Sequence, residues 1–184
     1  MALNATIFKA DLQIADMDRH YYNSHALTIA RHPSETDERM MVRVLAFARH
    51  AHEALSFAKG LSDNDEPDIW QKDLTGAIEL WIEVGLPEEK RILKACGRAD
   101  QVVLYTYGGH GASIWWNQIS SKLARLKNLT VINVASATTQ ALADLAQRSM
   151  QLQCTVEDGD VWLGGNDGTV QVEMSILMSP QSSR

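Results

Sequence analysis

The sequence predicts a mixed α/β (α+β) fold, with a mixed sheet flanked by helices, in a single domain spanning residues 1–184. Aliphatic side chains alternate along several short segments, which indicates strands with one buried face. Other apolar residues recur at helical spacing between these segments, which indicates helices that pack on the sheet. The length of 184 residues, the 45% hydrophobic content and the 22% charged content are typical of one compact globular domain.

The chain opens with a predicted β-hairpin, followed by a long helix. Apolar residues alternate along residues 4–15, and a second candidate strand follows at residues 21–30. Ser34 is a suitable N-cap, and the apolar spacing after it predicts a helix that runs to about Lys59 and stops at Gly60. The hairpin is predicted as an addition to the part of the chain that follows.

Strands and helices then alternate to the end of the chain. The predicted elements are a hairpin at 68–84 with its turn at 73–76, a helix at 87–98, a strand at 101–107, a helix at 113–127, a strand at 129–134 and a helix ending near 147. Residues 101–107 are apolar on both faces, as in a strand reached by a crossover and buried between helices. Residues 150–178 predict a C-terminal β-meander.

Charge and composition limit the classes of function. The formal net charge of −6 argues against broad electrostatic binding of nucleic acid, although it leaves room for a local basic patch. No apolar run reaches membrane-spanning length, and the first residues lack the pattern of a signal peptide, so we expect no membrane partner. Cys96 and Cys154 are too few and too far apart for a disulfide framework or a zinc site. These features predict a cytoplasmic protein and leave its oligomeric state open.

The segment Ile78–Val84 carries acidic residues on one face of a predicted strand. Its aliphatic residues alternate with Glu79, Trp81 and Glu83, so two carboxylates flank an indole on the second face. Hard oxygen ligands of this kind suit Mg²⁺ or Mn²⁺. The segment is therefore a candidate metal site.

The preceding strand of the hairpin adds a third carboxylate. If Lys72 pairs with Ala77, Asp68 lies opposite Trp81 and diagonal to both acids of the second strand. A slip of one residue in this register would turn Asp68 to the core face. The metal-site hypothesis therefore depends on the register of the hairpin.

Acidic and basic side chains from two helices complete the candidate set. Glu38 falls in the first turn of the helix predicted after Ser34 and points toward its apolar side, although most acids there only stabilise the helix dipole. A basic group on the helix at 87–98 consists of Lys90, Arg91, Lys94 and Arg98. A lysine beside a metal could activate water, whereas a solvated basic surface or salt bridges to the acids would be purely structural.

Other common catalytic arrangements are not supported by the sequence. The six histidines show no metal-ligand spacing on a predicted element, and no serine lies in a nucleophile elbow. Neither cysteine has a nearby basic partner. The glycine-rich loop at 108–111 lacks the ending of a phosphate-binding loop.

Three motifs resemble the YaeQ family of bacterial proteins, and the resemblance extends over essentially the full length. They are R-H-P-S-E-T-x-E-R-M-M at residues 31–41, E-P-D-x-W at residues 66–70 and I-E-L-W-I-E-V-G-L-P at residues 78–87. The resemblance implies a divergent PD-(D/E)XK nuclease-like fold. The core of that fold is a helix, a three-stranded antiparallel unit, a second helix and a further strand.

The resemblance also implies roles for the acids. Pro67 and Asp68 match the "PD" of the motif, Glu83 is the expected second acid with Glu79 as the alternative, and Glu38 is the helix-borne acid. Asp68, Glu83 and Glu38 would then be the ligands of Mg²⁺ or Mn²⁺.

The motif lysine is missing from its usual place. Reading E-x-K from either acid of the strand puts Gly85 or Trp81 at the lysine position. In some branches of the fold the lysine has moved to the following helix, where Lys94 or Lys90 would take its role. This departure puts catalysis in question more than the fold.

Two functions follow from this resemblance. The first is a Mg²⁺-dependent nuclease or phosphodiesterase in which Lys94 helps to activate water. The second is a catalytically inactive module that binds nucleic acid or protein as a regulator. In either case Lys90, Arg91, Arg98, Trp70 and Trp81 are the candidate nucleic-acid-binding residues, the tryptophans by stacking on bases. A third reading is a structural ion-pair network with the function elsewhere.

Overall fold

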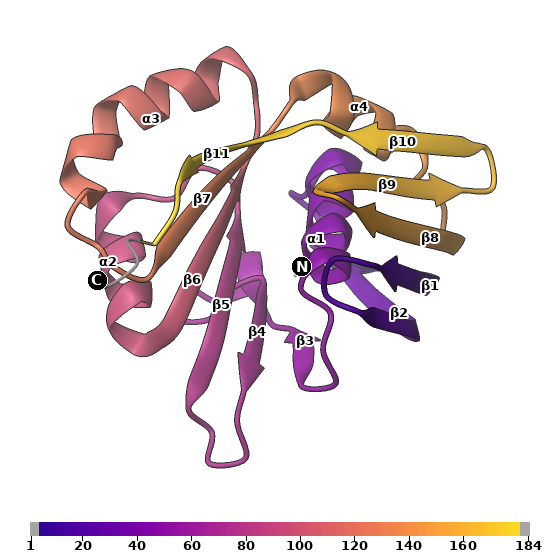
Figure 1. Ribbon diagram of the computed structural model, residues 1–184, viewed down its shortest axis with the longest axis horizontal. Helices are drawn as coiled ribbons and strands as arrows, with labels where there is room; N and C mark the ends of the chain where they lie inside the picture. Colours follow the sequence, from indigo (N-terminus) through magenta and orange to yellow (C-terminus); the bar gives the residue numbers. More distant parts are fainter. Residues whose placement is uncertain (1–3, 181–184) are drawn as a thin grey trace. The chain divides into compact units, whose positions relative to one another are not determined.

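The computed structural model describes residues 4–180, which divide between two compact units (Figure 1). Unit 1 consists of Met1–Ala51 and Ala137–Glu173, and unit 2 consists of His52–Ser136 and Met174–Arg184. Each unit therefore draws on two separate stretches of the chain. No single cut would divide the sequence into two continuous domains.

Unit 1 is built on a five-stranded mixed sheet with the order β10-β9-β8-β1-β2. The strands are β1 (Thr6–Asp16), β2 (Tyr21–Arg31), β8 (Ser149–Glu157), β9 (Asp160–Gly165) and β10 (Gly168–Val172). The predicted N-terminal hairpin is present as β1 and β2, and β1 also pairs in parallel with β8. Helix α1 (Asp37–Arg49) packs against β1, and α4 (Ser136–Asp144) precedes β8.

Helix α1 is shorter than the sequence predicts at both ends. Its N-cap is Thr36, whose hydroxyl accepts a hydrogen bond from the backbone N–H of Arg39 at 3.1 Å, so the predicted cap at Ser34 is wrong. The helix ends at Arg49, and residues Leu55–Phe57 form strand β3 instead of continuing to Lys59. Because β3 obtains its backbone partners from β4, its conformation depends on a strand outside the local apolar pattern.

Unit 2 is built on a six-stranded mixed sheet with the order β11-β7-β6-β5-β4-β3. Its further strands are β4 (Ile69–Lys72), β5 (Ile78–Val84), β6 (Ala99–Thr106), β7 (Leu129–Val134) and β11 (Met174–Met178). Strands β5, β6 and β7 are parallel and are connected through α2 (Glu89–Arg98) and α3 (His110–Leu123), with a short 3₁₀ turn at Gly60–Ser62 before β4. A core that includes Trp81, Ile92, Leu104, Ile119 and Leu123 joins the two helices to one face of this sheet.

The predicted C-terminal meander is only partly correct. Strands β8, β9 and β10 are antiparallel neighbours, but β11 leaves their sheet and pairs with β7 of unit 2. A mixed α+β fold with helices on its sheets is therefore confirmed, with two sheets where the sequence predicts one. No helix within residues 4–180 is long and apolar enough to cross a membrane.

Candidate functional site

The register of β4 and β5 places Asp68 beside Glu83. Trp70 pairs with Trp81 and Ile69 pairs with Ile82, and the backbone N–H of Asp68 donates to the carbonyl of Ile82 at 3.2 Å. The predicted register, with Asp68 opposite Trp81, is therefore wrong by two residues. A shift of two residues preserves the face to which each side chain points, so the two acids still share one side of the sheet.

The cause of this shift lies at the tip of the hairpin. Lys72 pairs with Ile78 and not with Ala77, and the register changes between Gln71 and Lys72. The carboxylate of Asp73 accepts hydrogen bonds from the backbone N–H groups of Thr75 and Ala77, at 2.8 and 3.0 Å. These side-chain contacts favour a longer turn than the sequence pattern suggests.

Asp68 is a buried part of this sheet, with 4% of its surface exposed. Its Oδ2 accepts a hydrogen bond from the backbone N–H of Val84 at 2.8 Å, and its carbonyl accepts one from Ala58 at 2.9 Å. Gly60 approaches the other carboxylate oxygen so closely that a β-carbon added there would lie 2.6 Å from Oδ1. Asp68 thus forms hydrogen bonds with both β5 and the connection between β3 and β4.

Glu83 is also buried, and Arg91 binds both of its carboxylate oxygens. The Nε atom of Arg91 lies 2.8 Å from Oε1 and 2.9 Å from Oε2, and the indole N–H of Trp81 donates to Oε1 at 3.0 Å. Burial is the largest influence and raises the pKa of Glu83, the nearby Asp68 also raises it, and Arg91 and Trp81 act in the opposite direction. The net result is a raised pKa for this carboxyl.

Arg91 extends this contact to the loop before β4. Its Nη1 donates to the carbonyl of Asn64 at 2.7 Å, and its Nη2 donates to the carbonyl of Glu66 at 3.0 Å. One guanidinium therefore connects α2, β5 and the 64–66 loop. The fixed fork of an arginine suits this arrangement better than a lysine would.

Lys94 and Arg98 contact the same loop and not the acid pair. The amine of Lys94 lies 2.7 Å from the carboxylate of Asp65, and this hydrogen bond is the main reason why the pKa of Asp65 is lowered. Arg98 donates to the carbonyl of Asp65 at 2.8 Å and lies over the ring of Trp81. Lys90 is exposed on the same helix.

The two tryptophans of the hairpin differ in exposure. Trp81 is only 3% exposed because α2 packs its residues Ile92 and Ala95 onto this face, which leaves little of its ring for the stacking on bases that the sequence suggests. Trp70 is half-buried, contacts Trp81 edge to face at 6.2 Å, and carries the amine of Lys72 at 3.7 Å from its ring centre. Of the pair, only Trp70 has surface left for stacking.

Of the two remaining predicted acids, Glu79 belongs to unit 2, as Asp68 does, and Glu38 belongs to unit 1. Glu79 accepts a hydrogen bond from the side chain of Gln71 at 2.7 Å, further along β5, so the geometry favours Glu83 over Glu79 as the partner of Asp68. Glu38 is half-buried in the first turn of α1 and belongs to unit 1. Its predicted role as a helix-borne ligand stays a prediction.

Glu35 is the acid that the sequence reasoning overlooked. It is buried before α1, and it accepts hydrogen bonds from Arg39 at 2.5 Å and from Arg43 at 2.6 and 2.9 Å. Arg43 is itself buried and also donates to the carbonyl of Ala30 at 3.1 Å. The signal was present in the sequence, because Arg43 interrupts an otherwise apolar run and a buried arginine needs a carboxylate partner.

The acid pair does not complete a metal site in this arrangement. Mg²⁺ requires near-octahedral oxygen coordination. Among residues 4–180, no group of three or more histidine, cysteine, aspartate or glutamate side chains is arranged to hold a metal ion. Arg91 also contacts both oxygens of Glu83 through its Nε atom. The arginine supplies the positive charge that a cation would otherwise bring.

The fold and this site define an α+β protein of two mixed sheets with two adjacent buried carboxylates, one of which binds an arginine. The family model described as "YaeQ protein" matches residues 1–174, and the chain belongs to this family. Proteins described as "Uncharacterized protein YaeQ" are 45% identical in Salmonella typhi and 44% identical in Escherichia coli K12. Each of these comparisons covers 98% of this chain and 99% of the relative.

Two crystal structures are similar to the chain along nearly its full length. The YaeQ protein from Xanthomonas axonopodis pv. citri gives a TM-score of 0.92 at 46% identity, covering 96% of this chain and 99% of that one. The YaeQ protein from Pseudomonas syringae gives a TM-score of 0.91 at 35% identity, covering 95% and 97%. These descriptions name a family and no activity.

Proposed function

We propose that this chain is a PD-(D/E)XK-type protein that binds nucleic acid without cutting it. The single observation behind the loss of cleavage is the contact between Arg91 and both carboxylate oxygens of Glu83. The guanidinium already balances the charge of this acid and would compete with a metal ion for its oxygens. The acid pair then serves to fix the 64–66 loop against the sheet.

The order of elements supports the PD-(D/E)XK part of the proposal. Helix α1 is followed by the antiparallel strands β3, β4 and β5, then by α2 and by β6, which is parallel to β5. This is the order that the fold requires. Asp68 directly precedes the middle strand of the antiparallel unit and Glu83 lies on its last strand, where the motif expects its acids.

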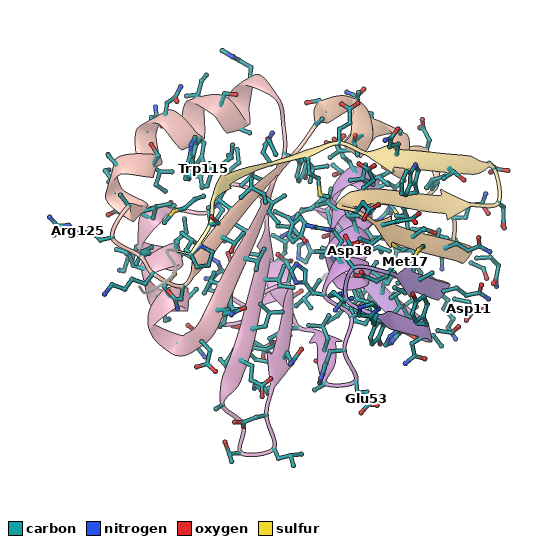
Figure 2. The ribbon with its side chains drawn as sticks, viewed as in Figure 1. Asp11, Met17, Asp18, Glu53, Trp115 and Arg125 are labelled. Atoms are coloured by element: carbon teal, nitrogen blue, oxygen red, sulfur yellow. The ribbon has the colours of Figure 1, made fainter. Side chains whose placement is uncertain are left out.

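The charge of one segment supports the binding part. Residues 87–127, which include α2 and α3, contain seven lysines and arginines and three acids, a net charge of +4, against −6 for the whole chain. Lys90, Lys122, Arg125 and Lys127 are exposed there, and Figure 2 shows Arg125 projecting away from the sheet. Such a local basic surface can bind phosphates by releasing counterions.

A second candidate function is the metal-dependent phosphodiesterase. It is favoured by the position of Asp68 beside Glu83 and by the raised pKa that results in part from their repulsion. A divalent cation between the two carboxylates would relieve this repulsion. Metal binding would first require Glu83 to separate from Arg91.

One set of assays distinguishes the two functions. Fluorescence anisotropy measures the binding of labelled single- and double-stranded DNA and RNA, and gels measure cleavage with Mg²⁺ or Mn²⁺. We expect binding that weakens steeply with salt, no cleavage, and no rise in melting temperature with either metal. Cleavage by the wild type that is lost in Asp68→Asn would establish the second function, and an absence of both binding and cleavage would overturn both.

A charge variant tests the location of the binding surface. Replacing Lys122, Arg125 and Lys127 together by serine should weaken binding and reduce the salt slope, by about 0.9 for each phosphate contact that is lost. Lys9→Ser in unit 1 is the matched control, because it removes an exposed charge from another surface. A loss in the control of about a third of that in the triple variant, in proportion to the charge removed, would show that only net charge matters.

Arg91→Met should destabilise the protein, because it leaves a buried carboxylate without its cation. We expect a loss of about 2–3 kcal/mol in the free energy of unfolding, less than for a fully buried pair because 30% of the Arg91 side chain is exposed. Urea denaturation measures the loss, and Glu83→Gln in the same background should recover part of it. Lys90→Met, on the exposed side of α2, is the control and should change stability little.

A further inference from the structure

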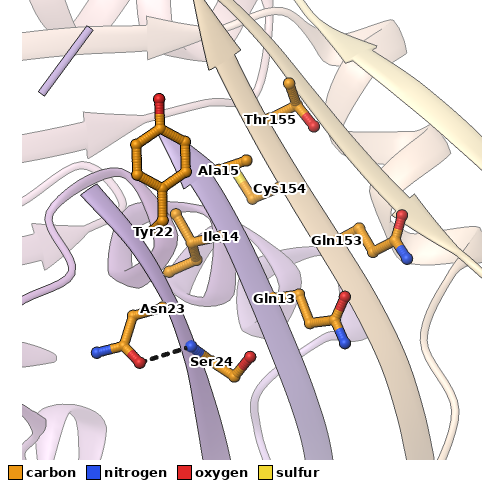
Figure 3. Close-up of a pocket in the computed structure, with 9 residues that line it drawn as sticks. All are labelled: Gln13, Ile14, Ala15, Tyr22, Asn23, Ser24, Gln153, Cys154 and Thr155. Atoms are coloured by element: carbon orange, nitrogen blue, oxygen red, sulfur yellow. Dashed lines mark hydrogen bonds between the residues drawn. The ribbon is translucent and has the colours of Figure 1, made fainter. Parts of the chain in front are cut away.

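A hollow lies over strands β1, β2 and β8, on the face of the unit 1 sheet that points away from its core (Figure 3). Its volume is about 500 Å³, within the usual range for sites that bind small molecules. Every residue that lines it belongs to unit 1. The hollow is therefore separate from the acid pair of unit 2.

The strand register explains the shape of this hollow. Ala15 of β1 pairs with Tyr22 on one side and with Thr155 on the other. Because Ala15 has only a methyl group, the floor is low between the tyrosine ring and the threonine. Tyr22 is 62% exposed, so much of its ring is available to a ligand. The hollow thus has a small floor and one aromatic wall.

The next row of side chains supplies hydrogen-bonding groups. Gln13 of β1 pairs with Ser24 of β2 and with Gln153 of β8, so two amides stand side by side (Figure 3). Within residues 4–180, the side chains of Gln13, Gln153 and Thr155 form no hydrogen bond with another residue. Each amide can both donate and accept. Asn23 is different, because its Oδ1 already accepts from the backbone N–H of Ser24 at 2.8 Å.

Charge narrows the class of ligand. The residues that line the hollow include no lysine, arginine, aspartate or glutamate. Unit 1 contains twelve acids and seven lysines and arginines, a net charge of −5, so its field repels phosphates and other anions. A cationic ligand would find no carboxylate in the lining to bind. The chemistry is that of a neutral ligand rich in donors and acceptors.

We propose that this hollow binds a neutral saccharide. Vicinal hydroxyls can each donate to and accept from the paired amides of Gln13 and Gln153, and the hydroxyl of Thr155 adds a third contact. The apolar face of a sugar ring can pack on the exposed ring of Tyr22, which is amphipathic and loses little entropy on binding. This binding site is independent of the function proposed for unit 2.

The test uses the full chain and a panel of neutral mono- and oligosaccharides, with neutral nucleosides as the competing class. Saturation-transfer NMR identifies binders, and the side-chain NH₂ signals of Gln13 and Gln153 report the place of binding. We expect at least one saccharide to bind and to shift both signals. The variant Gln13→Ala/Gln153→Ala should bind it about tenfold more weakly, as expected for the loss of two neutral hydrogen bonds.

Two further variants make the outcome decisive. Ala15→Trp should fill the hollow and abolish binding, and Gln118→Ala, an exposed glutamine of α3 in unit 2, should leave it unchanged. Backbone NMR spectra check that each variant is folded. The proposal is overturned if no saccharide binds, if binding is insensitive to the glutamine and Ala15 variants, or if nucleosides bind more tightly with the same variant dependence.

Discussion

Glu83 shows how a single buried acid can connect stability to pH. Its pKa in the folded protein is raised above the usual 4.5, chiefly by burial, so the folded state holds the proton more tightly than the unfolded state. The stability that comes from this protonated carboxyl is fully present below about pH 4.5 and is lost as the pH rises through the folded pKa. Lowering the pH therefore increases the contribution of Glu83 to the free energy of unfolding.

We expect the free energy of unfolding of the wild type, relative to Glu83→Gln, to fall as the pH rises from about 4 to 7. Urea denaturation of both proteins across this range measures the difference. Repeating the pair in an Arg91→Met background should move the fall to higher pH, because the guanidinium lowers the pKa. A difference that is constant across the range would contradict the raised pKa.

Gly60 is required beside Asp68 for two separate reasons. Its backbone φ is +50°, a conformation that residues other than glycine rarely adopt. Its missing β-carbon also leaves room for Asp68 Oδ1. Gly60→Ala should lower the free energy of unfolding by about 2–3 kcal/mol. Gly76→Ala is the matched control, because Gly76 has a φ of +87° but no atom within 4 Å of the added carbon. A smaller loss at Gly60 than at Gly76 would contradict the close approach.

The choice of acids was predictable at the residue scale, but their chemistry was not. The alternation of residues 78–84 puts Glu83 on the same face as Asp68, and the structure keeps both there. The sequence could not reveal that Arg91 contacts Glu83, because a helix face that carries basic residues can either be exposed to solvent or pack on a sheet. It also could not reveal that Trp81 is buried, because its burial depends on the tertiary packing of α2 on β5 and not on the local sequence pattern.

At the scale of elements, a buried ion pair joins α1 to the hairpin of unit 1. Arg43 of α1 binds Glu35 with two nitrogens and the carbonyl of Ala30 in β2 with one of them. The side chains of Arg43 and Glu35 are only 6% and 1% exposed. Loss of either partner leaves the other charged and desolvated.

Arg43→Met should lower the free energy of unfolding by about 3–5 kcal/mol, because it leaves Glu35 buried with one remaining arginine. Arg31→Met is the control: Arg31 forms an ion pair with Asp37 in which both side chains are partly exposed, and we expect a loss below about 1 kcal/mol. Thermal and urea unfolding measure both variants. Equal losses would mean that burial does not determine the strength of these pairs.

Elements with strong local signals were predicted well, and those that depend on distant partners were not. The hairpin of β1 and β2 and the presence of helices α2, α3 and α4 follow from local alternation and helical spacing, although α3 spans His110–Leu123 and not the predicted 113–127. The end of α1, the pairing of β11 with β7 and the division into two sheets depend on strand pairing between remote segments. Periodicity within a window carries no information about those pairings.

At the scale of the whole molecule, unit 1 is assembled from two stretches that are far apart in the sequence, Met1–Ala51 and Ala137–Glu173. Strand β1 pairs in parallel with β8, from Lys9 with Ser149 to Asp16 with Val156. Leu12 is fully buried between these strands and β2. A substitution that destabilises β1 should therefore destabilise β8 as well.

Leu12→Ala should lower the free energy of unfolding by about 2–5 kcal/mol by leaving a cavity in this core. Native-state hydrogen exchange should show the amides of β8 losing protection together with those of β1, because each strand provides hydrogen-bond partners for the other. Thr28→Ala, an exposed change on β2, serves as the control. Protection that persists in β8 while β1 exchanges would contradict this coupling.

The parallel pairing of β1 with β8 also bears on how the chain folds as it is synthesised. Contacting residues of the two strands, such as Asp11 and Gln151, are separated by 140 positions. The hairpin of β1 and β2 is made early, but the inner edge of β1 has no native partner until β8 has been added. An unpaired edge of this kind can pair with other chains, and contacts of such long separation form slowly. Completion of unit 1 is therefore among the last events of folding, although its first strand is among the first segments made.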